Sequence, residues 1–165
     1  MQRWTNPEPL ALPIAFDAVN RIDLEFVNVR GDAGSFTAYV FLNAEGLESG
    51  ADREHERFAG SFSIFSQEEC WGAEGHCDWK RGPVSPFDRR PPHHLTPTNI
   101  TMDVTETARR LGDPSELFVT VHAARASDPE LAEGVLRFDR LTALAYVGSL
   151  ARALPVVPAR DDLVT

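Results

Sequence analysis

The run Arg57-Phe-Ala-Gly-Ser-Phe-Ser-Ile-Phe65 alternates bulky apolar residues with small ones, which is the two-residue period of a β-strand. Phe58, Phe62 and Ile64 fall on one side of this run, together with Gly60. A glycine inside a strand usually marks a bulge or a place where another group approaches the backbone closely. We therefore predict a strand with such a feature at Gly60.

The residues that follow this strand lose all periodicity. Residues 66–94 contain both cysteines, three of the five histidines and two of the three tryptophans of the chain. We predict a long irregular loop here, and we expect any chemistry of the chain to lie in it. The residues outside this loop have the patterns of strands and a helix, and we interpret them as a structural scaffold.

Four other segments read as strands or strand pairs. They are residues 21–29, whose alternation slips at its end, and residues 35–42, 99–104 and 116–123. Because Gly31-Asp-Ala-Gly34 can form a turn, the first two segments are predicted to pair as a hairpin. Residues 135–147 fit either a helix or strands, and their aromatic and β-branched content favours strands.

A short helix is predicted from Thr105 to Gly112. Thr105 is a suitable N-terminal cap, Ala108 and Leu111 would face inward, and Gly112 can end the helix.

Together these elements predict an antiparallel β-sandwich of about six to eight strands with one short helix and a long irregular loop. With 165 residues, 42% of them apolar, the chain is long and apolar enough to form one hydrophobic core. We expect an N-terminal arm over residues 1–19, the sandwich domain over 20–150 and a C-terminal tail over 151–165.

The net charge of −9 and the pI near 5.0 argue against nucleic acid or an anionic membrane as a partner, since either requires a basic surface. The sequence shows neither a membrane-spanning apolar run nor a signal-peptide pattern, and we expect a protein that is cytoplasmic, or exported only with a partner. Two cysteines in a reducing compartment do not form a disulfide framework.

The predicted loop offers thiolate and imidazole groups that suit Cu(I) or Zn(II): Cys70, His76, Cys77, His93 and His94. The alternative for the cysteines is a disulfide or two buried thiols that fix the loop. Adjacent histidines on an extended segment do not easily face one ion, so at most one of the pair would be a ligand. The alternative for that pair is hydrogen bonding that anchors the loop.

Three aromatic residues of the same segment, Trp71, Trp79 and Phe87, are candidates for insertion into a partner's pocket. They could equally pack beneath the loop and order it. Outside the loop, His122 is expected to be a partly buried histidine of a sheet, and His55 to lie in a solvated charged run. No nucleophile elbow, phosphate-binding glycine loop or zinc-protease motif occurs in the sequence.

The order of several motifs resembles the C-terminal domain of the tyrosinase, polyphenol oxidase and molluscan haemocyanin group. The motifs are Arg21-Ile-Asp-Leu-Glu-Phe26, Ser35-Phe-Thr-Ala-Tyr-Val-Phe-Leu-Asn43, Phe58-Ala-Gly-Ser-Phe62, Asn99-Ile-Thr-Met-Asp-Val-Thr-Glu106 and Leu117-Phe-Val-Thr-Val121. Gly75-His-Cys-Asp78 and Arg90-Pro-Pro-His-His-Leu-Thr-Pro97 are similar to bacterial members of the group. The resemblance spans about residues 20 to 125.

What this resemblance implies is a β-sandwich that covers the copper site of a helical oxidase domain, places a side chain in its entrance and in some members helps copper loading. A binuclear copper centre of this group uses six histidines, whereas this chain has five, scattered along the sequence. We therefore expect a non-catalytic accessory subunit or detached domain whose partner is a tyrosinase-like copper oxidase. The alternatives are a copper chaperone that binds Cu(I) through Cys70, His76 and Cys77, and an enzyme of another type with a pocket at the 66–94 loop.

Overall fold

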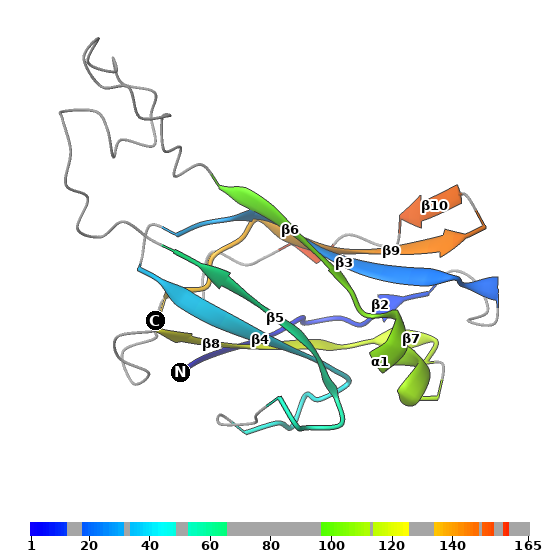
Figure 1. Ribbon diagram of the computed structural model, residues 1–165, viewed down its shortest axis with the longest axis horizontal. Helices are drawn as coiled ribbons and strands as arrows, with labels where there is room; N and C mark the ends of the chain where they lie inside the picture. The colour runs from blue at the N-terminus through cyan, green and yellow to red at the C-terminus, as the bar shows by residue number, and fades with distance from the viewer. Residues whose placement is uncertain are drawn as a thin grey trace, which may run out of the picture.

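A computed structural model describes residues 1–12, 18–31, 34–48, 53–65, 97–112, 114–125, 134–148, 150–153 and 157–158. Two antiparallel sheets lie face to face, which confirms the predicted β-sandwich (Figure 1). The first sheet has the order β1 (Gln2–Thr5), β8 (Val119–Arg125), β4 (Phe36–Leu42) and β5 (Phe58–Ile64). The second has the order β10 (Leu150–Ala153), β9 (Arg140–Val147), β3 (Arg21–Val29) and β6 (Thr98–Asp103), and β11 (Val157–Pro158) also pairs with β9.

The predicted hairpin between residues 21–29 and 35–42 is wrong. Strand β3 pairs with β6 and β9, whereas β4 pairs with β5 and β8, so the two segments belong to opposite sheets. Each of the two strands has one strongly apolar face. Placing the strands on opposite sides of the core buries both faces more completely than pairing them side by side in one sheet. The turn residues between them therefore carry the chain from one sheet to the other.

An aromatic chain runs through the core between the sheets. The ring of Trp4 in β1 lies 4.9 Å from that of Phe138, which lies 5.3 Å from Phe26 in β3. The ring of Phe62 in β5 lies 5.3 Å from Phe26 on the other side. Edge-to-face and tilted contacts of this kind add about 0.5–1.5 kcal/mol each to the burial of the rings. They tie the two edge strands of the first sheet to the middle of the second.

Gly60 has both features predicted for it. Val40 pairs with Gly60 and Phe41 pairs with Phe58, which leaves Ala59 as the extra residue of a bulge. The backbone of Gly60 has φ +154°, and a β-carbon there would lie 3.0 Å from Sδ of Met102 in β6. The slip predicted at the end of β3 is also a bulge, because its register with β6 shifts between Phe26 and Val29.

Both ends of the chain add strands to the sandwich. Within the segment expected as an arm, β1 pairs with β8, and β2 (Leu10–Ala11) pairs with β7 (Glu116–Leu117). Within the segment expected as a tail, the backbones of β10 and β11 pair with β9. Residues 135–147 contain β9, which confirms the preference for strand.

Helix α1 (Thr105–Arg110) is the helix of the described residues, and it follows β6 directly (Figure 1). Ala108 is fully buried, and Gly112, at φ +82°, follows the last turn, as predicted. Thr105 is not the cap, because Val104 holds the cap position and makes no side-chain cap bond. The Thr105 hydroxyl instead serves the contact with β3 described below. The described part of the chain has no helix long and apolar enough to cross a membrane.

Candidate functional site

A cleft of about 870 Å³ opens where α1 meets the start of β3 and the residues that lead into β5. Four arginines contribute to its walls, Arg21, Arg53, Arg109 and Arg110. Four carboxylates accompany them, Glu54, Glu56, Asp103 and Glu106. A cleft so rich in both charges is suited to polar and charged ligands rather than to apolar ones.

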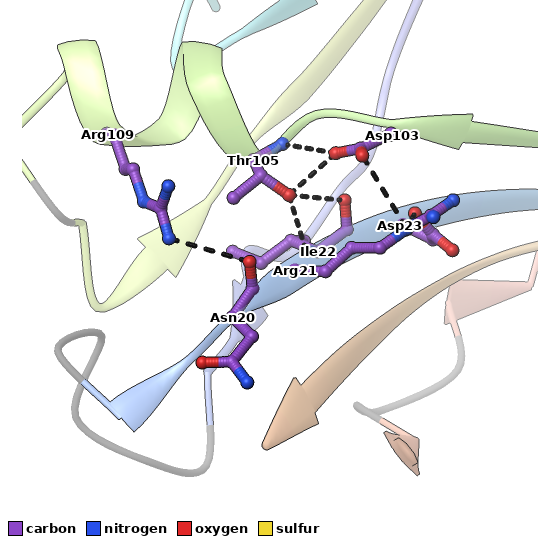
Figure 2. Close-up of polar contacts among 7 residues, drawn as sticks. All are labelled: Asn20, Arg21, Ile22, Asp23, Asp103, Thr105 and Arg109. Carbon is purple, nitrogen blue, oxygen red and sulfur yellow. Dashed lines mark hydrogen bonds and ion pairs between the residues drawn. The ribbon is translucent and has the colours of Figure 1, made fainter. Parts of the chain in front are cut away.

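Thr105 lines this cleft and joins α1 to β3 through hydrogen bonds (Figure 2). Its hydroxyl donates to Oδ1 of Asp103 over 2.6 Å and accepts a hydrogen bond from the Ile22 backbone N–H over 2.8 Å. The Thr105 backbone N–H donates to the same Asp103 oxygen over 3.0 Å. These bonds hold the first turn of α1 against β3, so the helix has a fixed position relative to the second sheet.

Asp23 and Asp103 face each other across the β3–β6 ladder, and Arg21 lies between their carboxylates. Arg21 Nε lies 2.7 Å from Asp23 Oδ1 and 3.6 Å from Asp103 Oδ2. Burial raises the pKa of Asp103, but the hydrogen bonds from Thr105 and the charges of Arg21 and Arg109 outweigh it, so the pKa lies below its usual value. The Asp103 carboxylate is therefore charged at neutral pH, and Arg21 lies close to both carboxylates.

The C-terminal half of α1 is fastened to the first sheet. Thr107 Oγ1 donates to the Phe58 carbonyl over 3.1 Å, and an Arg110 Nη donates to the same carbonyl over 3.3 Å. These contacts cover the open backbone edge at the start of β5, where another chain could otherwise pair. Helix α1 thus bridges the two sheets, and the cleft has walls from both.

The eight site residues predicted from the sequence all lie outside the described residues. They are Cys70, Trp71, His76, Cys77, Trp79, Phe87, His93 and His94. The structure does describe the strands that flank them: Ile64 pairs with Phe36, and Thr98 pairs with Val29. A β-carbon on Gly31 would lie 2.7 Å from Cγ2 of Ile64, so these pairs lie at the same end of the sandwich. The end of β5 and the start of β6, which flank segment 66–96, therefore lie at one end of the sandwich, near Gly31 (Figure 1).

His55 and His122 are the two histidines that the structure describes, and they flank one aromatic ring. Their ring centroids lie 5.9 Å and 5.3 Å from that of Phe41. His122 is fully buried, more than the sequence predicted, and neither ring nitrogen has a partner that satisfies hydrogen-bond geometry. Burial lowers the pKa of His122, as does Arg3, its cross-strand neighbour, while the Leu47 backbone raises it less. Among the described residues, no group of three or more metal-ligating side chains is placed to hold an ion.

The polar cleft was not predicted from the sequence. His55 and the charged residues around it, Arg53 among them, were interpreted as a solvated run, and no role was predicted for the charged residues of α1. Charge density in both segments was the available signal, but no pattern along the chain shows that the two segments meet.

The described residues form a protein of the two-layer antiparallel β-sandwich class, with a helix that bridges the two layers. No protein-family model and no curated protein sequence matches the chain. Solved structures described as latent aurone synthase (polyphenol oxidase) do match it.

The recombinantly expressed enzyme matches with a TM-score of 0.47 and 13% identity over 97% of this chain and 24% of that chain. The enzyme from natural source matches with a TM-score of 0.46 and 13% identity over 97% of this chain and 25% of that one. The chain therefore spans about a quarter of the length of the proteins it matches. At this level of similarity the match carries no conclusion about family, activity or partners.

Proposed function

We propose that this chain is a non-catalytic accessory domain that docks on a tyrosinase-like binuclear copper oxidase and shields the entrance to its copper site. The order of sequence motifs over residues 20 to 125 supports this function. The five histidines of the chain are fewer than the six that a binuclear copper centre of this group requires, so the copper would belong to the partner.

The observation that carries the proposal is the placement of the strands on either side of segment 66–96. Strands β5 and β6 belong to different sheets, yet the end of one and the start of the other lie at the same end of the sandwich. The pairing of β5 with β4, the pairing of β6 with β3 and the bulge at Gly60 fix the positions of these two strand ends. A segment rich in aromatic residues, attached at both ends to a rigid scaffold, is suited to insertion into a partner's cavity.

The apolar surface next to this segment supports the same function. Phe65, the residue after β5, is 81% exposed, and it is one of two large apolar side chains exposed among the described residues. An exposed aromatic residue beside the predicted inserting residues Trp71, Trp79 and Phe87 would enlarge the contact. We infer that this end of the sandwich faces the oxidase.

The experiment that tests the proposal is a mixing assay with a separately produced, copper-loaded helical domain of a tyrosinase-type oxidase, chosen from the same genome. Size-exclusion chromatography with light scattering measures the mass of the mixture. We expect a one-to-one complex that forms less readily when Phe65 is replaced by Ser. Elution of two separate proteins at tens of micromolar, far above the dissociation constants of standard-size interfaces, would refute docking.

A further inference from the structure

The arginines of the cleft beside α1 differ in whether a carboxylate neutralises them. Arg21 is paired with Asp23, and Arg110 Nη1 lies 3.7 Å from Glu106 Oε1. Within the described ranges, Arg53 and Arg109 have no carboxylate within 4.0 Å. Two of the four guanidinium groups therefore form no ion pair within 4.0 Å in the described part of the chain, although the charge of Arg109 acts on Asp103 at longer range.

The four carboxylates of the cleft, by contrast, are all engaged. Asp103 accepts from Thr105 and lies near Arg21, and Glu106 lies near Arg110. Glu56 Oε1 lies 3.6 Å from Arg57 Nε, and Glu54 also has an interaction partner. The four arginines and four carboxylates of the lining balance in formal charge, so an acidic ligand would be bound by the open donors of Arg53 and Arg109 and not by a net positive charge. At physiological ionic strength, charges beyond about 8 Å are largely screened, so the overall acidity of the chain has little effect inside the cleft.

Arg53 and Arg109 are both held in position. Arg53 Cζ lies 5.6 Å from the centroid of the Tyr39 ring, which takes up one face of its guanidinium plane. One terminal nitrogen of Arg109 donates to the carbonyls of Val19 and Asn20 over 3.4 Å and 3.5 Å (Figure 2 shows the second contact). A guanidinium has five N–H donors in a planar fork, so most donors of both groups remain open.

The two arginines come from different segments of the cleft wall, Arg53 from the residues before β5 and Arg109 from α1. Guanidinium forks recognise carboxylates by two parallel hydrogen bonds. A cleft of about 870 Å³ easily admits one or two acidic side chains of a polypeptide. Its own carboxylates oppose a dense polyanion such as nucleic acid, and they tolerate an isolated acidic residue between the arginines.

We propose that this cleft binds a carboxylate of an Asp or Glu side chain on the partner polypeptide, through Arg53 and Arg109. The inference rests on the docking function proposed above and adds a second contact to it, on the α1 side of the sandwich. The partner is thereby expected to present an exposed acidic loop.

The test uses the full chain, labelled with nitrogen-15, and a blocked peptide Gly-Glu-Gly-Glu-Gly at about 150 mM salt. The Gln counterpart of the peptide and inorganic phosphate are titrated alongside. Amide shifts are expected in residues 53–59 and 105–110 with the Glu peptide and not with the Gln peptide. The double variant Arg53→Gln, Arg109→Gln should weaken binding by about tenfold or more, because charge-assisted hydrogen bonds are lost.

Arg30→Gln is the control for the loss of an arginine charge outside the cleft, where Arg30 pairs with Asp139; it removes one charge, and the double variant removes two. It should bind like the wild type. Circular dichroism verifies that all variants fold. The inference is overturned if the double variant binds the peptide unchanged, if the shifts lie elsewhere, or if phosphate binds as tightly as the Glu peptide.

Titration of the oxidase domain separates this inference from the docking function. If the oxidase binds the wild type and the double variant equally, the carboxylate site is wrong and docking stands. If the Glu peptide binds in the cleft but the oxidase does not bind at all, docking fails and the site stands.

Discussion

Gly60 of β5 and Met102 of β6 meet across the open side of the sandwich, where Met102 Sδ lies 3.0 Å from the position of a β-carbon on Gly60. This contact joins the edge strands of the two sheets just before and just after segment 66–96. It leaves no room for a larger residue, and the backbone conformation of Gly60 is one that other residues rarely adopt.

Gly60→Ala is therefore expected to lower the free energy of unfolding by about 1–3 kcal/mol, through strain and overpacking. Urea unfolding followed by tryptophan fluorescence measures the change. Gly46→Ala is the control, because a β-carbon on Gly46 has no atom within 4 Å, and its effect should stay within about 0.5 kcal/mol. Equal effects of the two substitutions would contradict the close packing of β5 on β6.

Thr105→Val tests the attachment of α1 to β3. The substitution keeps the shape but leaves the buried Ile22 N–H without its acceptor and removes a donor to Asp103. We expect a loss of about 1–3 kcal/mol in unfolding free energy, the cost of an unsatisfied buried group. Thr101→Val, on an exposed position of β6, should have little effect. A neutral result for Thr105→Val would show that its hydroxyl does not fix the helix.

Asn6→Ala tests the attachment of the N-terminal strand. The Asn6 side chain accepts from the Val119 N–H over 2.5 Å, and its backbone N–H donates to the Val119 carbonyl over 3.2 Å. Loss of the side chain should cost about 1–3 kcal/mol and speed hydrogen exchange at Val119. Asn20→Ala, where the side chain is exposed, is the control. Unchanged exchange at Val119 would rule out this role for Asn6.

His122 makes the stability of the fold depend on pH. Its pKa in the folded chain lies below the usual 6.5, because burial and Arg3 disfavour the charged ring, so the unfolded chain binds more protons in acid. The contribution of the neutral His122 ring to the free energy of unfolding is complete above pH 6.5, and it is lost as the pH falls below that value. Chemical unfolding at a series of pH values between about 7.5 and about 4.5, a range that spans the histidine titration, measures how the free energy of unfolding changes with pH.

His122→Leu removes the titrating group and should flatten the pH dependence below pH 6.5, with little loss at neutral pH because neither ring nitrogen forms a hydrogen bond. His55→Gln, at a half-exposed position, should keep the slope of the wild type. A slope that persists in His122→Leu would mean that other groups cause the acid sensitivity.

The strands were predictable from sequence because their signal is local. The alternation in residues 35–42 and 116–123 follows directly from one buried face, and the bulge glycine in β5 was recognisable by its position. The pairing of the strands was not predictable in the same way. Strands β3 and β4 are neighbours in sequence, and the choice between a hairpin and a crossover depends on strands such as β9 that come a hundred residues later.

The polar cleft could not be found from sequence for the same reason. Arg53 and Arg109 are separated in sequence by β5, segment 66–96 and β6, and only the packing of α1 between the sheets brings their segments to one cleft. Neither lies in a recognisable motif. The predicted ligands and inserting residues between Cys70 and His94 lie outside the described residues, so their roles stay predictions.

The central claim, that this chain shields a copper oxidase, is tested most directly by the rate of diphenol oxidation as a function of the concentration of this chain. The account predicts saturable inhibition of the copper-loaded helical domain by the wild type, and weaker inhibition by a variant with Trp71, Trp79 and Phe87 replaced by alanine. An oxidation rate that stays constant at every concentration of the wild-type chain would contradict it.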